Sequence, residues 1–331
     1  MRQSSTLKEL SEILNLSIST VSRALKDHPD ISEESKKRVR ELALALEYEP
    51  NAYAIQLRTN ESKVLGILVP SVANFFYDSF ISAVEEEARS TGYSVFIMQS
   101  GDDAQVELNS LKLLKRNRVT GLFVAITTDT NDLQPFLKLN ELNIPLVFFD
   151  RVPDYENCNK ICLADKAAAA IAAEALVKKN KKRILALFGH PNLTISRKRY
   201  DSFKDTYERL SPDATVEYGF PLNTEEGRVL TLNAIERNDP PDAVFCMGDL
   251  ILIGAMQAIH EKGLTVPGNI SVISISNGFI PMLYNPKITY VETSGYKLGK
   301  LAFKRMMNCV AGDSSVQELT IDSLLVQGGS L

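Results

Sequence analysis

The chain has 331 residues, of which 44% are hydrophobic and 24% are charged, a balance typical of a globular protein with two or three domains. Its 37 basic and 41 acidic side chains give a formal net charge of -4, which by itself indicates no class of partner. No apolar stretch reaches the roughly 18–20 residues of a membrane helix, and residues 1–17 lack the apolar segment of a signal peptide, so we expect a cytoplasmic protein with no membrane partner.

Three short helices are predicted in the first fifty residues. Thr6, followed three residues later by a glutamate, fits a capping box ahead of leucines at helical spacing. Asn15 stands where a tight turn needs a residue that tolerates a positive φ. Ser17 is a suitable N-cap for a second helix, and Ser32 begins a third whose first turn is acidic. Pro50 ends this unit.

The first two helices, joined by a short turn, predict a helix-turn-helix whose second helix lies in the major groove of DNA. Arg23 on its exposed face can make a bidentate contact to guanine, and Ile18 can touch a thymine methyl group. The hydroxyls of Ser17, Thr20 and Ser22 can reach phosphates. A three-helix bundle that only packs or dimerises fits the same periodicity, so both interpretations remain open on the pattern alone.

Charge in this segment is balanced, because residues 1–60 contain equal numbers of basic and acidic side chains. A DNA-binding head without a basic excess depends on where its charges are placed. Residues 51–58 can form two helical turns, which would be marginal in water if isolated, and residues 59–63 are polar. We therefore expect a head at 1–50, a hinge helix and linker at 51–63, and a body at 64–331.

From residue 64 onward, apolar runs alternate with helical patterns. Strands are expected at 64–70, 93–98, 119–125, 145–149, 183–189, 242–246, 270–275 and 317–327. Helices are expected at 76–91, 104–117, 130–142, 165–180, 197–210, 224–238, 248–263 and 294–310. This alternation predicts an α/β body of doubly wound parallel sheets with helices on both faces.

A break after Arg151 divides the body into two lobes. We expect one lobe at about 64–163 and 294–322, and the other at about 164–293 and 323–331. The fold class is therefore an all-α helix-turn-helix head followed by two doubly wound parallel-sheet lobes.

Polar and aromatic residues follow four of the predicted strands, at the edge where doubly wound sheets bind ligands. They are Asn74, Phe75, Phe76, Tyr77, Asp150, Arg151, Asp249, Ser276 and Asn277. Carboxylates and amides beside aromatic rings suit a sugar or a nucleobase. The aromatic residues also fit the buried start of a helix, the aspartates fit helix caps or surface charges, and Arg151 fits an ordinary ion pair.

Signs of enzymatic chemistry are missing from the sequence. There is no glycine-rich phosphate loop and no Gly-x-Ser-x-Gly elbow, and the three histidines lie in unrelated segments. Cys158 and Cys162 lie four residues apart without the further ligands of a zinc site, so the four cysteines are interpreted as buried or incidental thiols. His190 follows a strand, but a lone histidine is more often structural. We expect no metal, no cofactor and no enzymatic activity.

The literal sequence of the head closely resembles the lactose-repressor (LacI/GalR) family. The matching runs are residues 6–11 (TLKELS), 16–25 (LSISTVSRAL), 31–32 (IS), 37–39 (KRV) and 46–52 (LEYEPNA). The resemblance implies that Ile18, Ser19 and Arg23 contact bases. It also implies a phosphate-contacting and supporting set made of Thr6, Ser17, Thr20, Ser22, Ser32, Tyr48 and Asn51.

The same resemblance implies that residues 51–58 form a hinge helix that folds when two subunits meet on DNA. Leu57 matches the leucine that wedges into a central minor-groove step, and Arg58 lies beside it. Two departures stand out, because Glu47 and Asn15 replace glycines that are frequent in the family.

The body matches the family at several effector positions, which implies lobes of the periplasmic-binding-protein type. The matches are Asn74 with Phe76 and Tyr77, Asp150 with Arg151, Arg199 with Phe203, and Asp249. Phe75 replaces a usual proline. Ser276 replaces an aspartate that often binds the ligand in the family. This departure implies either a different effector or a ligand held mainly by Asp150, Arg199 and Asn277.

These observations together predict a dimeric transcriptional regulator, a repressor, that binds a roughly palindromic double-stranded operator. Its control would come from a small effector, a sugar or sugar derivative, bound between the lobes. The alternative is a solute-binding protein of the bilobed sugar-binding type with no transcriptional role. Such a protein would have a signal peptide in place of residues 1–60.

Overall fold

The computed structural model describes residues 6–48 and 62–331. The chain divides into two compact units, Met1–Ser62 and Lys63–Leu331, called here the head and the body. None of the helices in the described ranges combines the length and apolar character needed to span a bilayer. The cysteines are free thiols, with Cys158, Cys162 and Cys246 buried and Cys309 partly exposed.

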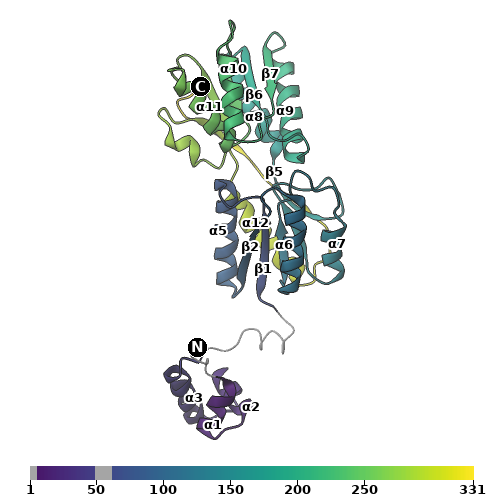
Figure 1. The fold of residues 1–331 in the computed structure, drawn as a ribbon, viewed down its shortest axis with the longest axis vertical. Helices are drawn as coiled ribbons and strands as arrows, with labels where there is room; N and C mark the ends of the chain where they lie inside the picture. The colour runs from purple at the N-terminus through teal and green to yellow at the C-terminus, as the bar shows by residue number, and fades with distance from the viewer. Residues whose placement is uncertain (1–5, 49–61) are drawn as a thin grey trace. The chain divides into compact units, whose positions relative to one another are not determined.

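The head consists of α1 (Leu7–Leu14), α2 (Ile18–Leu25) and α3 (Glu33–Ala45), drawn in purple in Figure 1. The predicted capping box is present, because the Thr6 hydroxyl accepts from the Glu9 amide while the Glu9 carboxylate accepts from the Thr6 amide. Asn15 adopts a φ of 51°, as the turn requires. The core of the head contains Leu10, Val21, Ala24, Val39 and Ala43.

Glu47 also adopts a left-handed conformation, with a φ of 49°. A side chain at this φ is strained relative to glycine, which gives a physical reason for the glycine in the resembled family. Tyr48 follows it and packs against the head core.

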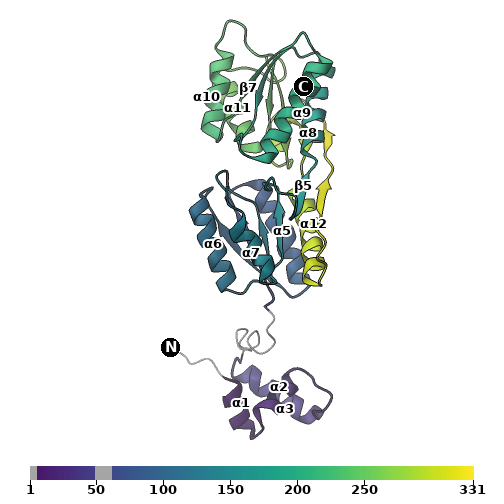
Figure 2. The ribbon, with the colours of Figure 1, turned by 90° about the vertical axis from the view of Figure 1, so that its right-hand side faces the viewer.

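The first lobe of the body contains a parallel sheet in the order β11-β5-β4-β3-β1-β2. Its strands are β1 (Val64–Val69), β2 (Ser94–Gln99), β3 (Gly121–Val124), β4 (Leu146–Phe149), β5 (Asn159–Leu163) and β11 (Glu318–Ile321). Its helices are α5 (Phe75–Ser90), α6 (Ala104–Arg116), α7 (Gln134–Glu141) and α12 (Gly295–Val310). Helices α5 and α12 cover one face and α6 and α7 the other, as Figure 2 shows.

The second lobe has a sheet in the order β12-β10-β9-β8-β6-β7, parallel except for the antiparallel β12. Its strands are β6 (Arg183–Leu187), β7 (Thr215–Gly219), β8 (Ala243–Cys246), β9 (Ser271–Ser276), β10 (Thr289–Glu292) and β12 (Leu324–Val326). Its helices are α8 (Asp165–Lys178), α9 (Thr194–Leu210), α10 (Thr224–Ile235) and α11 (Asp249–Glu261), with the 3-10 turn η1 (Ile280–Leu283). Helices α8 and α9 cover one face, and α10 and α11 cover the other.

The predicted fold class is confirmed, and its helices agree with the structure to within a few residues. Three strands were not predicted, namely β5, β7 and β10, because their apolar runs are short and interrupted by polar residues. The single strand predicted at 317–327 is wrong. That segment forms β11 in the first sheet and β12 in the second, so it crosses between the lobes.

Candidate DNA-binding face and effector cleft

Helix α2 and its N-cap present the residues predicted to contact bases. Ile18 is 47% exposed although it is apolar, and Ser17 and Ser19 are also exposed. The Arg23 side chain is exposed and reaches Asp30 only at 3.9 Å, a distance at which an exposed pair contributes little. Arg23 and Ile18 are therefore available to a groove.

Several predicted phosphate ligands also cap helices. The Ser17 hydroxyl accepts from the Thr20 amide at 3.1 Å and contacts the Ser19 and Thr20 hydroxyls at 2.7 and 2.8 Å. The Ser32 hydroxyl accepts from the Ser35 amide at 3.3 Å. These caps fix the start of each helix, so their first contribution is to position the helix N-termini, where amides can meet phosphates.

Two other residues predicted to contact DNA are less exposed. Ser22 is partly buried on α2, and Tyr48 is partly buried against the head core, where burial raises the pKa of its phenol. Asn51, Leu57 and Arg58 lie outside the described residues.

A network of charges joins the turn after α2 to α3, which sequence reasoning missed. Asp27 accepts from Arg40 at 2.7 Å and lies 3.2 Å from the buried Lys36, which also pairs with Glu33 at 2.7 Å. The hydrogen bond and charge of Lys36 lower the pKa of Asp27. Two of the basic side chains of the head thus hold its own fold together and are less available to DNA.

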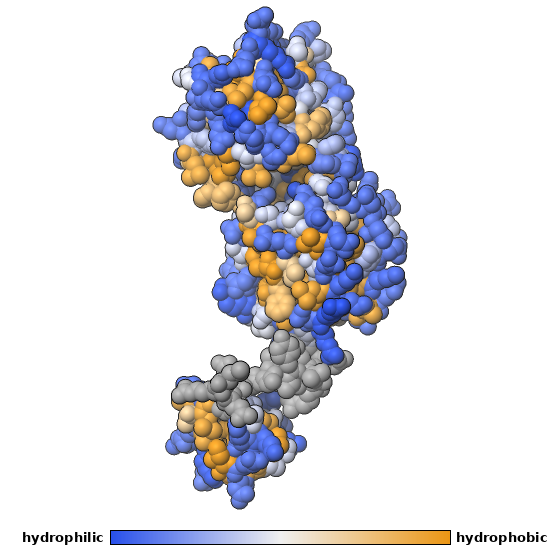
Figure 3. Space-filling view, viewed as in Figure 1, coloured by the Kyte–Doolittle hydropathy of each residue, from blue (hydrophilic) through white to orange (hydrophobic). Residues whose placement is uncertain are grey.

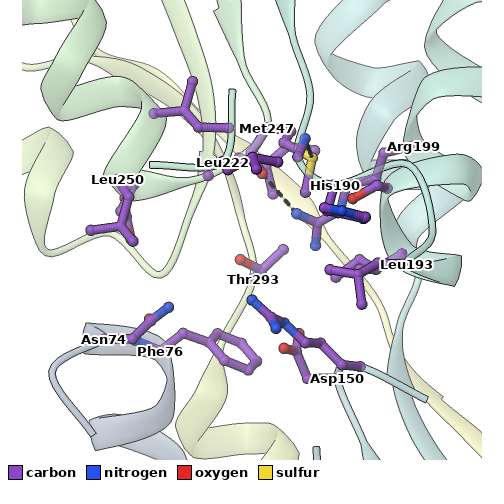
Figure 4. Close-up of a pocket in the computed structure, with 18 of the residues that line it drawn as sticks. Asn74, Phe76, Asp150, His190, Leu193, Arg199, Leu222, Met247, Leu250 and Thr293 are labelled. Atoms are coloured by element: carbon purple, nitrogen blue, oxygen red, sulfur yellow. Dashed lines mark hydrogen bonds between the residues drawn. The ribbon is translucent and has the colours of Figure 1, made fainter. Parts of the chain in front are cut away.

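In the body, one cavity of about 430 Å³ between the carboxyl ends of the two sheets is lined by nine of the predicted residues, namely Asn74, Phe76, Tyr77, Asp150, Arg151, Arg199, Asp249, Ser276 and Asn277. Phe75 and Phe203 are not among its lining residues, and Phe203 lies in the hydrophobic core of the second lobe. Figure 4 shows Asn74, Phe76 and Asp150 on one side and Arg199 on the other. These residues are distant in sequence, and the crossover topology brings them together.

The wall from the first lobe is built around Asp150, which has a φ of 56° at the end of β4. The Tyr77 hydroxyl donates to Asp150 Oδ2 at 2.8 Å. Burial raises the pKa of Asp150, while the hydrogen bond from Tyr77 opposes that shift. Arg151 donates to Asp102 Oδ1 at 2.9 Å, so the ordinary ion pair considered from the sequence does exist. Asn74 caps α5 by accepting from the Phe76 amide at 2.9 Å.

The wall from the second lobe is built around Arg199, which is only 5% exposed. Its Nε and Nη2 atoms lie 2.9 and 2.8 Å from Asp165 Oδ1, and its Nη1 donates to the Met247 carbonyl at 2.7 Å. Burial raises the pKa of Asp165 to about 6 even though Arg199 lowers it. Much of the donor capacity of Arg199 is therefore spent within the lobe.

Ser276, the departure that sequence reasoning emphasised, is engaged with a neighbour. Its hydroxyl donates to Asp249 Oδ1 and accepts from the Gly278 amide at 3.0 Å. Burial raises the pKa of Asp249 to about 6, and the Ser276 hydrogen bond opposes this. The carboxylate missing at 276 is thus replaced by a serine that supports the carboxylate at 249.

Contacts between the lobes flank the cavity. On one side the Phe75 and Phe279 rings lie 4.6 Å apart, and Asn277 donates to the Ser79 hydroxyl at 3.4 Å. On the other side, the Thr194 hydroxyl donates to the Val152 carbonyl at 2.7 Å.

The cavity has further polar lining residues that sequence reasoning did not assign to it. They are Asp102, Thr128, Asp129, His190, Ser196 and Thr293. Asp102 follows the predicted strand β2, so the rule that ligands bind at strand ends could have identified it. Thr293 follows β10, and β10 itself was not predicted. No group of three or more metal-binding side chains occurs within the described part of the chain.

A helix-turn-helix head and two crossed-over α/β lobes with a polar cavity between them define a ligand-controlled DNA-binding regulator. Residues 6–51 match the model of bacterial regulatory proteins of the lacI family, and residues 62–327 match that of periplasmic binding proteins and the sugar-binding domain of the LacI family. The chain therefore belongs to the LacI family of DNA-binding transcriptional repressors, which are not enzymes. The match of the head sets aside the solute-binding alternative.

The chain is similar along most of its length to curated members of the family. It is 30% identical over 301 residues to the HTH-type transcriptional repressor PurR of Pasteurella multocida, covering 90% of this chain and 89% of that one. It is 26% identical over 302 residues to the ribose operon repressor of Halalkalibacterium halodurans, covering 91% and 89%.

Solved structures share the fold. The Lac repressor dimer bound to operator and the anti-inducer ONPF superposes with a TM-score of 0.87 at 23% identity, covering 99% of both chains. A periplasmic binding protein/LacI regulator from Alkaliphilus metalliredigens, complexed with D-xylulofuranose, gives a TM-score of 0.70 at 22% identity, covering 81% of this chain and 99% of that one.

Proposed function

We propose that this repressor binds a roughly palindromic operator as a homodimer and that a sugar or sugar derivative in the cleft controls this binding. The observation that supports the effector site best is the convergence of nine predicted side chains on one cavity. A role in transcription implies that the protein acts in the cytoplasm, where it meets chromosomal DNA.

Exposed apolar side chains of the body support the homodimer. Phe96 and Ile97 are 41% and 44% exposed on β2, at the edge of the first sheet. Phe279, Met282 and Leu283 are 50–66% exposed around η1 in the second lobe. Figure 3 shows hydrophobic residues gathered on the surface of both lobes. An apolar strand edge left bare invites pairing, so a second copy of the chain would cover it.

In the proposed complex, α2 of each subunit enters the major groove of one half-site. Arg23 reads a guanine, and Ile18 and Ser19 contact neighbouring base edges. The hydroxyls and helix N-termini at Ser17 and Ser32 position the head on phosphates. The resemblance to the family supplies the remaining roles, with residues 51–63 as hinge and linker and Leu57 and Arg58 in the minor groove.

Effector binding would be coupled to DNA binding through the lobes. A ligand that contacts both walls of the cavity favours one angle between the lobes over another, and only this difference in affinity can shift the equilibrium. The dimer then transmits the angle to the hinge segments. A typical coupling of about 1–3 kcal/mol changes operator affinity roughly 5- to 150-fold.

Fluorescence anisotropy with DNA from upstream of the gene tests the DNA-binding half of the proposal. Arg23→Ala should weaken specific binding by about 1–3 kcal/mol, since one bidentate base contact is lost. Lys37→Ala, an exposed control on α3, should keep sequence discrimination. Leu57→Ala should weaken binding and reduce DNA bending. Equal affinity of the wild type, Arg23→Ala, Leu57→Ala and a chain lacking residues 1–60 would refute the proposal.

A further inference from the structure

The two guanidinium groups that line the cavity are each matched by a carboxylate of the protein. Arg199 lies 2.8 Å from Asp165, with their side chains only 6% and 4% exposed. Arg151 lies 2.9 Å from Asp102. A phosphate or carboxylate on a ligand would have to compete with these partners for the same positive charge, and an internal partner that lost the competition would be left unpaired. Each arginine of the cleft is therefore already paired with an acidic side chain of the protein.

Among the described residues, two partly buried carboxylates of the cavity have no such match, and neither has the exposed Asp129. Asp150 accepts from the Tyr77 hydroxyl at 2.8 Å and Asp249 accepts from the Ser276 hydroxyl, both of which are neutral donors. Within residues 6–48 and 62–331, neither carboxylate forms an ion pair. Burial raises the pKa of both carboxyl groups, that of Asp249 to about 6, and the positive charge of Arg199 opposes this rise at both groups. The cavity thus contains two partly buried carboxyl groups beyond those that pair with its arginines.

Neutral polar groups complete the lining. The Ser196 hydroxyl, on a residue only 1% exposed, has no hydrogen-bond partner among the described residues. His190 Nδ1 accepts from the Asn192 amide at 3.2 Å, which leaves the proton of the neutral ring on Nε2. Figure 4 shows His190 close to Arg199 on one side of the cavity and the Phe76 ring on the opposite side. Hydroxyl groups of a ligand both donate and accept hydrogen bonds, so they can bond to these neutral atoms and to the two unpaired carboxyl groups.

We propose that the effector is a polyhydroxylated ring without negative charge, either uncharged or positively charged through an amine, and that the cleft rejects phosphorylated and acidic sugars. This inference rests on the proposed function and specifies the ligand class of the same site. Asp150 and Asp249 accept O–H or N–H groups from the ring, and Phe76 packs against one of its faces. A phosphate or uronate group in the cavity meets Asp150 and Asp249, which form no direct ion pair with an arginine, and like charges in such a setting are strongly unfavourable.

Ligand-induced thermal stabilisation of the full-length protein tests this with matched series of probes. Each series contains a neutral sugar and its charged forms. The first is D-glucose with glucosamine, glucose 6-phosphate and glucuronate, the second is D-galactose with the corresponding derivatives, and the third is D-ribose with ribose 5-phosphate. For the series that binds, the neutral or amino form should bind at least about tenfold more tightly than its phosphate or acid.

An Asp249→Asn variant checks that the unpaired carboxyl group causes the discrimination. Removing one negative charge should narrow the ratio between the neutral sugar and its phosphate several-fold. Asp205→Asn, which removes an exposed carboxylate from α9, should leave the ratio unchanged. If Asp249→Asn fails to fold, the wild-type series decides the question alone.

The outcomes separate this inference from the proposed function. A phosphate or uronate that binds as tightly as its neutral parent, or more tightly, overturns the inference about charge while leaving a sugar-controlled repressor intact. Absence of stabilisation by every probe overturns the sugar effector itself and this inference with it. An unchanged ratio in Asp249→Asn overturns the role assigned to the unpaired carboxyl group.

Discussion

Replacement of Arg199 by alanine would show what the buried guanidinium contributes to the second lobe. In the structure it lies within 2.9 Å of Asp165 through two nitrogens and donates to the Met247 carbonyl. Alanine leaves a buried carboxylate without its cation and a carbonyl without its donor. Breaking a buried pair from one side costs about 3–5 kcal/mol, so we expect a loss of this size in the free energy of unfolding.

The pH dependence of that loss follows from the pKa of Asp165. Burial already raises it to about 6, above its ordinary value of 3.8, and removal of Arg199 raises it further. A carboxyl whose folded pKa is raised loses stability as pH rises from the unfolded pKa to the folded one. The difference between wild type and Arg199→Ala should therefore be smaller at pH 5, where the unpaired carboxyl takes up a proton, than at pH 8.

Urea denaturation followed by circular dichroism measures both effects. The double variant Arg199→Met/Asp165→Leu should recover most of the lost stability, because it removes the unpaired charge together with its partner. A loss below about 1 kcal/mol in Arg199→Ala, or a double variant no more stable than the single one, would refute the reasoning.

Three further predictions concern separate parts of the body. Asp249→Asn should stabilise the ligand-free protein by at most about 3 kcal/mol at pH 8 and by less at pH 5, because burial raises the Asp249 pKa to about 6. Unfolding curves at both pH values measure this difference. An equal gain in the free energy of unfolding at both pH values would contradict the prediction. Phe279→Ala removes the ring contact with Phe75, which contributes about 0.5–1.5 kcal/mol to the contact between the lobes. Effector affinity in thermal titrations should therefore fall up to about tenfold. Unchanged affinity would exclude a role for this ring pair in holding the lobes together. Ile97→Lys should halve the molecular mass in analytical ultracentrifugation, whereas Leu142→Lys, another exposed apolar residue, should not; a dimer in Ile97→Lys would place the interface elsewhere.

The sequence was informative where apolar patterning and helix caps are strong. The capping box at Thr6 and the left-handed Asn15 were predicted because each depends on residues close in sequence. The strands β7 and β10 were missed because they are short and contain polar residues, and they form only through pairing with β6 and β9. The division of residues 317–327 between two sheets depends on a crossover that no local pattern reveals.

The residues of the effector site were likewise predictable only where the signal is local in the sequence. Side chains directly after predicted strands, such as Asp150 and Asp249, were identified from position and resemblance. The pairing of Arg199 with Asp165 and of Ser276 with Asp249 was not predictable, since each joins residues about 30 positions apart whose relation depends on the packed lobe. Sequence reasoning therefore treated Arg199 as a free ligand-binding group, whereas the structure shows much of its hydrogen-bonding capacity already used.

Operator affinity measured with and without the stabilising sugar tests the central claim that the cleft controls the head. Anisotropy titrations of the full-length protein should show a change of about 5- to 150-fold on addition of the sugar. The change should be lost in Asp150→Asn, which removes a cleft carboxylate, and kept in Asp205→Asn on the exposed face of α9. An operator affinity that is the same with and without bound sugar in the wild type would contradict the account.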